Sequence, residues 1–149
     1  MSSTTFTHAG FNCKIMLTSM GHYCGYVDVP PGHPFFSKAY GDVVPAPKHI
    51  INRPVSVGKD VGTIPLFCAT SVTDTSAPID LLMHVHGGIT YASKAENGKD
   101  WTFGFDCAHS DDGRKEGDPG WKDEAFVMAE CRRLAEQLAD VPKWFEVWA

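Results

Sequence analysis

The chain has 149 residues, of which 43% are hydrophobic and 21% charged, and its formal net charge is −5. This length is typical of one domain over residues 1–149 with a single hydrophobic core, and the composition argues against a disordered chain. Lysines and arginines are scattered along the sequence, so we do not expect the concentrated positive face that nucleic-acid binding requires.

The cysteines and the N-terminus indicate the compartment. The five cysteines are odd in number and show no CxxC spacing, which predicts neither a disulfide framework nor a zinc ribbon. The N-terminus lacks the basic and apolar regions of a signal peptide, and no stretch approaches the roughly 20 apolar residues that span a bilayer. We therefore expect a reduced, soluble, cytoplasmic protein without membrane contact.

The first half of the chain predicts two strands followed by a long irregular segment. Phe11 to Leu17 and His22 to Val29 have strand-like composition, with a turn at Ser19-Met20-Gly21 between them. Pro30 to Pro34 ends the second strand, because proline removes backbone donors. Prolines and glycines recur further on, and for a Pro/Gly-rich insertion at about 43–78 we expect short edge strands rather than helices.

Strand signals return in the second half. Leu81 to His86 is apolar on both faces, as in a central strand covered on two sides, and Gly87-Gly88 interrupts it. Ile89 to Ala92 is extended again, and Ser93 to Lys99 predicts a hairpin loop. Trp101 to Cys107 is the strongest strand of the chain. Its apolar stripe consists of Trp101, Phe103, Phe105 and Cys107.

A helix is predicted from Asp123 to Ala139, where apolar residues recur at the spacing of one helix face. Asp123 suits the N-cap and Pro142 prevents continuation of the helix. The aromatic tail, Trp144 to Trp148, is expected to dock as a last strand or to lie in an interface, which makes a homodimer a second hypothesis. Strands followed by a late helix predict an α+β fold, in which the helix covers a mainly antiparallel sheet.

Three motifs carry a resemblance to a known family. They are Gly21-His22-x-Cys24-Gly25-Tyr26-Val27-x-Val29-Pro30-x-Gly32-His33-Pro34, then His86-Gly87-Gly88-Ile89-Thr90-Tyr91-Ala92, then Trp101-x-Phe103-Gly104-Phe105-Asp106-Cys107-Ala108-His109. In these motifs and in the helix that follows them, the chain resembles a family of small uncharacterised proteins encoded by bacteriophages and by bacterial genomes, often within prophages. The resemblance implies no particular chemistry. The polar, cysteine and glycine positions that fit the family pattern are His22, Cys24, His33, His86, Gly87, Gly88, Asp106, Cys107, His109 and Glu130.

Short histidine and cysteine pairs raise the hypothesis of a metal site. His22/Cys24, His84/His86 and Cys107/His109 each have a spacing that places two side chains on one strand face. Zinc or another divalent metal accepts such ligands, and the candidates are His84, His86, Cys107 and His109. The competing interpretation is that the cysteines pack in the core and the histidines form structural hydrogen bonds.

Catalysis has two candidate mechanisms in this sequence. Cys107 as a thiolate nucleophile with His86 or His109 as its base would need an electropositive site, whereas the neighbouring Asp106, Asp111 and Asp112 are acidic. Acid and base chemistry by His86 with Asp106 or Asp112 is easier to reconcile with the sequence. A structural histidine–aspartate hydrogen bond would look the same in the sequence.

Two function classes follow from these features. The first is a non-catalytic phage accessory protein that binds a small polar ligand, such as a nucleotide, or a host protein, and so counteracts host defence in the host cytoplasm. Its candidate ligand-binding residues are His86, Gly87, Gly88, Tyr91, Asp106 and His109. The second is a small hydrolase, metal-dependent or not, that uses His86, Asp106 and His109 as catalytic residues.

Overall fold

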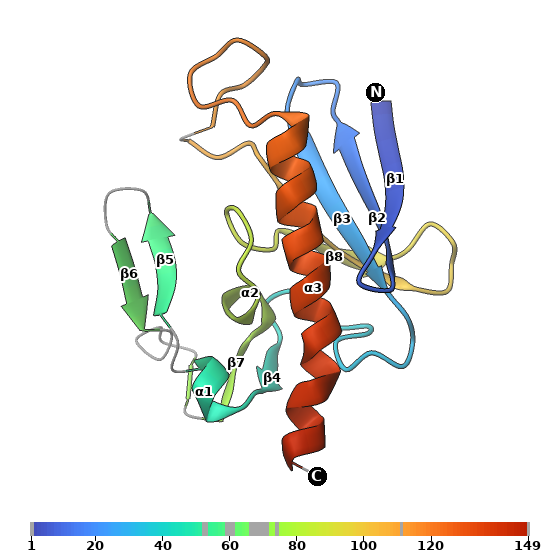
Figure 1. Cartoon of the computed structure of the whole chain (residues 1–149), viewed down its shortest axis with the longest axis vertical. Coiled ribbons are helices and arrows are strands. Elements are labelled where there is room, and N and C mark those ends of the chain that lie inside the picture. Colours follow the sequence, from blue (N-terminus) through green and yellow to red (C-terminus); the bar gives the residue numbers. More distant parts are fainter. Residues whose placement is uncertain are drawn as a thin grey trace.

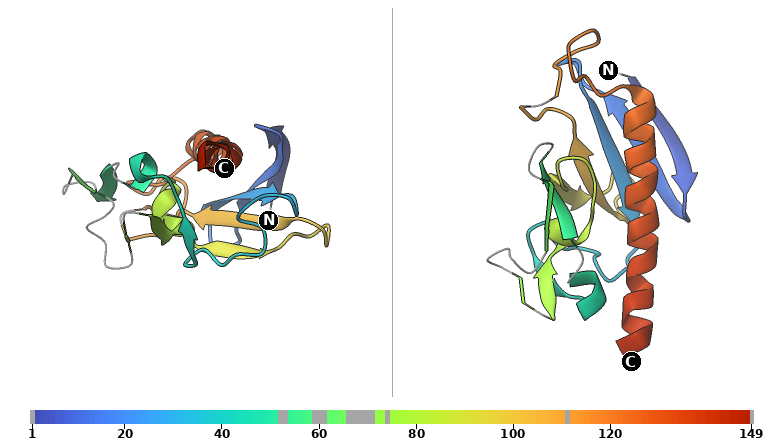
Figure 2. Two further views of the ribbon diagram at one scale, coloured as in Figure 1. Left: turned by 90° about the horizontal axis from the view of Figure 1, so that it is seen from below. Right: turned by 60° about the vertical axis from the view of Figure 1, so that its left-hand side comes forward.

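The computed structural model describes residues 2–51, 54–58, 62–65, 72–73, 75–110 and 112–148 (Figure 1). Its main layer is a five-stranded antiparallel sheet in the order β1-β2-β3-β9-β8. These strands are β1 Ser2–His8, β2 Phe11–Leu17, β3 Tyr23–Val29, β9 Trp101–Asp106 and β8 Tyr91–Lys94. Helix α3 (Glu124–Trp148) packs on β2 and β3 and covers one side of the sheet (Figure 2). The predicted α+β class is therefore confirmed.

The segment between β3 and β8 forms smaller elements beside this sheet. β4 (Val43–Pro45) pairs with β7 (Ser76–Pro78), and β5 (Pro54–Gly58) pairs with β6 (Gly62–Pro65). The expected short strands are thus present, but two single-turn helices, α1 (Lys48–Ile51) and α2 (Ile79–Leu82), lie in or beside them. Parts of the predicted insertion, residues 52–53, 59–61, 66–71 and 74, lie outside the described residues.

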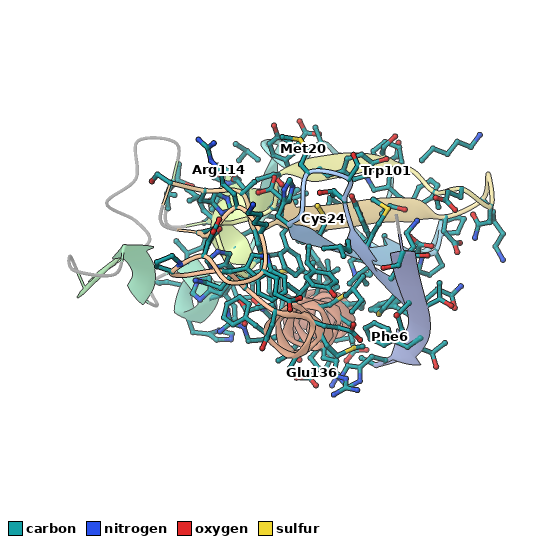
Figure 3. The ribbon with its side chains drawn as sticks, turned by 90° about the horizontal axis from the view of Figure 1, so that it is seen from above. Phe6, Met20, Cys24, Trp101, Arg114 and Glu136 are labelled. Carbon is teal, nitrogen blue, oxygen red and sulfur yellow. The ribbon has the colours of Figure 1, made fainter. Side chains whose placement is uncertain are left out.

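Strand β1 was not predicted, because Ser2–His8 is polar and largely exposed and so lacks an apolar stripe. It forms a hairpin with β2 through a two-residue turn in which Ala9 and Gly10 both have positive φ (52° and 87°), the geometry that matches strand twist. Arg132 of α3 lies over the Phe6 ring, and His8 contacts Glu136. Figure 3 shows Phe6 and Glu136 on the same flank, so this edge strand is tied to the helix.

The core lies between α3 and the apolar stripes of the central strands. Gly25 of β3 faces Phe105 of β9, and a Cβ at Gly25 would come within 2.4 Å of the Phe105 ring. The Phe105 ring thus fills the space above the glycine, which keeps the strand pair closely packed. The residues from β3, β9 and α3 that are buried in this core include Val27, Val29, Phe103, Phe105, Val127, Cys131, Leu134, Ala135 and Leu138.

The prediction of a strand at Leu81 to His86 is wrong. The chain leaves α2 at Leu82, and residues 83–86 pass beside α3 without pairing with a strand. Side chains of the helix take the place of a neighbouring strand. Gln137 accepts a hydrogen bond from the His84 amide (2.6 Å) and donates one to the His84 carbonyl (2.7 Å), and Glu130 accepts one from the His86 amide (2.8 Å). The apolar residues of this segment therefore reflect burial in the core, to which Leu82, Met83 and Val85 belong, and not a central strand.

The prediction that the helix stops before Pro142 is also wrong, because α3 continues to Trp148. Proline has no amide hydrogen, so the carbonyl four residues earlier, on Leu138, loses its helical donor. Nε2 of the buried His33 lies 2.7 Å from that carbonyl oxygen and donates to it, while Nδ1 accepts a hydrogen bond from the Phe35 amide. Burial lowers the pKa of His33, which favours this neutral tautomer.

The helical tail adds to the core and forms no last strand. Trp144 is buried, and its ring meets the ring of Phe35 edge-on, with the centroids 6.1 Å apart. Asp123 caps the other end of α3, as predicted, by accepting a hydrogen bond from the Phe126 amide. Among the described residues, no helix is both long and apolar enough to cross a membrane.

The His33 contact predicts a coupling between two substitutions. His33→Phe keeps the ring but leaves the Leu138 carbonyl without a donor, whereas in a Pro142→Ala background the helix itself supplies the donor. We expect His33→Phe to cost less stability in the Pro142→Ala background, by about 1–3 kcal/mol. Urea unfolding of the four proteins measures this difference. Equal costs in both backgrounds would show that His33 does not replace the missing amide.

Candidate functional site

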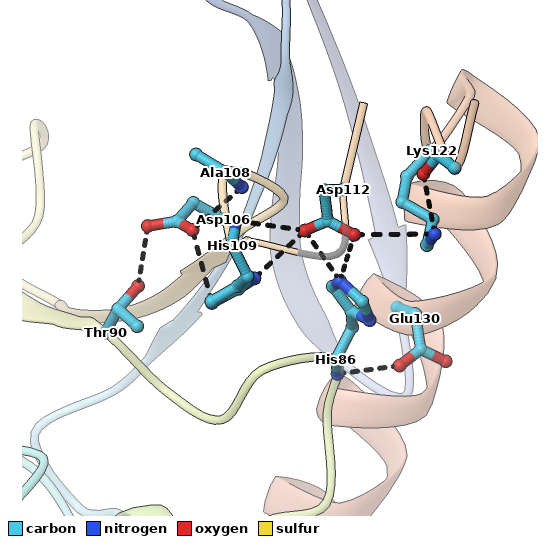
Figure 4. A network of polar contacts seen from close by, with 9 residues as sticks. His86, Thr90, Asp106, Ala108, His109, Asp112, Lys122 and Glu130 are labelled. Atoms are coloured by element: carbon cyan, nitrogen blue, oxygen red, sulfur yellow. Dashed lines mark hydrogen bonds and ion pairs between the residues drawn. The ribbon is translucent and has the colours of Figure 1, made fainter. Parts of the chain in front are cut away.

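Four polar side chains meet at one end of the sheet, and we call them the His–Asp cluster: His86, Asp106, His109 and Asp112 (Figure 4). His86 comes from the segment beside α3, and Asp106 is the last residue of β9. His109 and Asp112 follow in the loop between β9 and α3. Two separate parts of the sequence thus contribute to the cluster, His86 and the stretch from Asp106 to Asp112.

Asp112 is the centre of the cluster. Nε2 of His86 lies 3.0 Å from each carboxylate oxygen, and Nδ1 of His109 lies 3.0 Å from Oδ2. The His109 amide also donates to Oδ2 at 3.1 Å, which closes a tight turn from residue 109 to 112. Both imidazoles are therefore oriented by one carboxylate.

The Asp112 carboxylate is buried and charged. Its side chain is 1% exposed, and Nζ of Lys122 lies 3.4 Å from Oδ1. Burial by itself raises the pKa of this carboxyl, but the hydrogen bonds from His86 and His109 outweigh that effect and lower the pKa to about 2. Asp112 is thus a fixed negative charge at neutral pH.

His109 has a carboxylate on each side of its ring. Nδ1 faces Asp112, and Nε2 lies 3.5 Å from Oδ1 of Asp106. Asp106 is held in turn by the Thr90 hydroxyl (3.3 Å) and by the Ala108 amide (3.2 Å). This chain of contacts leaves the His109 ring little freedom.

His86 is held through its backbone and its ring. Its amide donates to Glu130 of α3, and its ring lies edge-on to the rings of His109 and Phe126, at centroid distances of 5.3 and 5.2 Å. Helix α3 therefore places this histidine, and the side chain of His86 remains 23% exposed.

Gly87 makes room for His109. A Cβ at Gly87 would lie 2.1 Å from Cε1 of the His109 ring, whereas a Cβ at Gly88 would meet no atom within 4 Å. Both glycines have positive φ, 70° and 81°. The diglycine therefore turns the chain, and its first residue also lets the imidazole approach the backbone.

The structure separates several residues that the sequence grouped together. Cys107 is 1% exposed in the core, and burial raises the pKa of its thiol to about 12, so it is neither a ready nucleophile nor a ready metal ligand. In the part of the chain that the structure describes, the potential metal-ligand group is His86, His109 and Asp112, without His84 or Cys107. The described cysteines are free thiols, and Cys68 and Asp111 lie outside the described residues.

Tyr91 belongs to a different feature, a groove across the sheet that we call the sheet groove. It has a volume of about 900 Å³, and its lining includes Lys14, Tyr26, Asp28, Tyr91, Lys94, Glu96, Asn97 and Thr102. Tyr26 directly precedes Val27 in β3, and the Val27 side chain is buried in the core beneath α3. Because successive side chains of a strand point to opposite faces, the Tyr26 ring points to the face opposite α3.

Two rings form the floor of the sheet groove. Tyr26 and Tyr91 both pair with Gly104 of β9, from opposite sides, and their rings meet edge-on with centroids 5.5 Å apart. A Cβ at Gly104 would lie 2.6 Å from the Tyr26 ring. The glycine in the predicted strand Trp101 to Cys107 thus creates the space for this aromatic pair.

Comparison with protein-family models, with curated proteins and with solved structures gave no match.

Chemically, the His–Asp cluster offers oriented imidazoles and ionised carboxylates, the groups that transfer protons or bind metal ions. Lys122 was not singled out in the sequence. It comes ten residues after Asp112, and no local motif connects the two.

Gly87→Ala and Gly88→Ala should separate backbone strain from the support of His109. Both variants place a side chain at a residue with positive φ, which lowers the free energy of unfolding by about 1–2 kcal/mol. Only Gly87→Ala also displaces the imidazole, for a further cost of about 1–3 kcal/mol. Chemical denaturation gives the costs, and NMR of the histidine rings should show a shifted His109 signal in Gly87→Ala alone. Similar spectra for the two variants would contradict the role of Gly87.

The lowered pKa of Asp112 predicts acid sensitivity. Because this pKa is about 2 in the folded chain against an ordinary value of 3.8, the ionised carboxylate stabilises the fold above about pH 4. That contribution is lost as the pH falls from about 4 to about 2. We expect the stability difference between wild type and Asp112→Asn to narrow over this range, as measured by urea unfolding. Asp140→Asn, at a side chain 56% exposed, is the control. A constant difference would contradict the prediction.

Proposed function

We propose that the protein is a non-catalytic binder of a small polar ligand that carries a planar ring, with a nucleotide as the model ligand, and that the sheet groove is its binding site. The observation that carries the proposal is the Tyr26–Tyr91 pair on the groove floor. Tyr91 is 43% exposed, so its ring offers free surface for a planar group. Stacking of a base on an aromatic side chain contributes about 1–3 kcal/mol.

Polar groups around the two rings support a ligand of mixed polarity. Lys14 lies over the Tyr26 ring, 5.5 Å from its centroid, and forms an ion pair with Glu96. Asp28 accepts a 2.6 Å hydrogen bond from Thr102, and Lys94 adds a second cation. Burial raises the pKa of Tyr26, so its hydroxyl stays protonated and can donate a hydrogen bond.

The resemblance to proteins of bacteriophages and prophages extends this proposal. A small protein that captures a host nucleotide, or that binds a host protein, acts in the host cytoplasm and counteracts host defence without needing turnover. This extension rests on the three sequence motifs and on the helix that follows them. It is an analogy at the level of the family.

A small hydrolase is the second candidate, and the His–Asp cluster is the observation that favours it. A histidine that donates one ring N–H to a carboxylate offers its other nitrogen as a proton acceptor, as in general-base catalysis. Nε2 of His86 contacts Asp112 in this way, whereas the two ring nitrogens of His109 face two carboxylates, those of Asp112 and Asp106. In this alternative, His86, Asp106 and His109 would activate water.

Ligand titration tests the proposal. Wild type is titrated with the four ribonucleoside 5′-monophosphates by calorimetry, and Tyr91→Ala should weaken binding about 5- to 150-fold, the loss of one stacked ring. Tyr40→Ala is the matched control, because Tyr40 is 41% exposed and does not line the groove. Absence of binding by wild type, or equal binding by Tyr91→Ala, would overturn the proposal. Chromatography of the same mixtures detects products, and turnover that His109→Ala abolishes would favour the hydrolase.

A further inference from the structure

We propose that His86, His109 and Asp112 bind one divalent transition-metal ion of the zinc type. Nε2 of His86, Nδ1 of His109 and a carboxylate oxygen of Asp112 all lie within 4.8 Å of one another. Two imidazoles and one carboxylate are a common donor set for such ions. This inference goes beyond the proposed ligand in the sheet groove and is independent of it.

The spacing of the three donor groups suits a single ion. Nε2 of His86 and Nδ1 of His109 each lie 3.0 Å from a carboxylate oxygen of Asp112. In a tetrahedral zinc site with bonds of about 2.0–2.1 Å, neighbouring ligand atoms lie about 3.3 Å apart. A small outward shift of the imidazoles therefore admits the ion, and the 23% exposure of His86 leaves a side open for a further ligand.

Asp106 provides the outer support that metal-binding histidines usually have. With Nδ1 of His109 on the ion, Nε2–H of the same ring points at Asp106 Oδ1, 3.5 Å away. A carboxylate at that position fixes the ring orientation and raises its basicity as a ligand. Thr90 and Ala108 hold Asp106 in turn.

A substitution at Lys122 distinguishes a metal site from a cluster that only forms structural hydrogen bonds. Its ammonium group lies 3.4 Å from Asp112 Oδ1, where it competes with a cation for the same carboxylate. Lys122 has other partners, the Gly120 carbonyl at 2.7 Å and the Phe126 ring at 5.6 Å. Lys122→Met should therefore tighten metal binding, whereas the same change would only weaken a hydrogen-bonded network.

The experiment uses the full chain, treated with chelator and then titrated with Zn²⁺ by calorimetry and with Co²⁺ by visible absorption. We expect one ion per chain. Asp112→Asn and His109→Ala should weaken binding at least about 100-fold, Asp106→Asn about 10- to 100-fold, and Lys122→Met should strengthen it severalfold. His8→Ala is the matched control, since His8 pairs with Glu136 and is outside the group.

Several outcomes would overturn the proposal. These are no binding by wild type, unchanged affinity in Asp112→Asn and His109→Ala, or weaker binding in Lys122→Met. The cysteines are intact in every variant, so a thiolate site elsewhere would appear as unchanged affinity. If Asp112→Asn or His109→Ala is not folded by circular dichroism, the metal affinities of Lys122→Met and Asp106→Asn still test the proposal. Tyr91→Ala should bind Zn²⁺ like wild type, which separates this result from the nucleotide titration.

Discussion

Buried backbone groups must find hydrogen-bond partners, and helix α3 supplies those partners to chain segments that pair with no strand. Gln137 binds both polar groups of the His84 peptide, and Glu130 binds the His86 amide. In the opposite direction, His33 donates to the Leu138 carbonyl that Pro142 leaves without a donor. The helix and the segments beside it thus supply hydrogen-bond partners to each other's backbone groups. The hydrogen bond from the His86 amide to Glu130 fixes the position of His86, and the His–Asp cluster depends on that position.

Where local periodicity decides the structure, the sequence was sufficient. The strands at Phe11 to Leu17 and Trp101 to Cys107 and the N-cap at Asp123 follow from alternation and capping, which involve near neighbours only. The α+β class followed from the same signals. The errors at Leu81 to His86 and at Pro142 have another cause, because each depends on a side chain far along the chain. Gln137 is 53 residues from His84, and His33 is 105 residues from Leu138.

The candidate site was predictable in part for the same reason. His86, Asp106 and His109 are predicted as candidates because imidazoles and carboxylates suit acid and base chemistry, and the structure does bring them together, although His86 does not end a strand. Sequence spacing alone did not decide which aspartate faces which histidine. The turn from His109 to Asp112 selects Asp112 for both imidazoles. Cys107 fits the motif equally well, but it continues the apolar stripe directly after β9, where it is buried and its thiol is not a ready nucleophile or metal ligand.

Strand β9 connects the two candidate sites. Gly104 lies beneath the tyrosine pair, and Asp106, two residues later, contacts His109. Alternation places both residues on the face opposite α3, about 7 Å apart along the strand. A ligand whose ring stacks on Tyr91 and whose polar group extends along β9 would therefore point toward Asp106, which contacts His109. The proposed binding in the groove and the proposed metal binding in the cluster are separate hypotheses, but β9 contributes a residue to each of the two sites. If both proposals hold, the length of the ligand would decide whether it stays in the groove or also reaches Asp106.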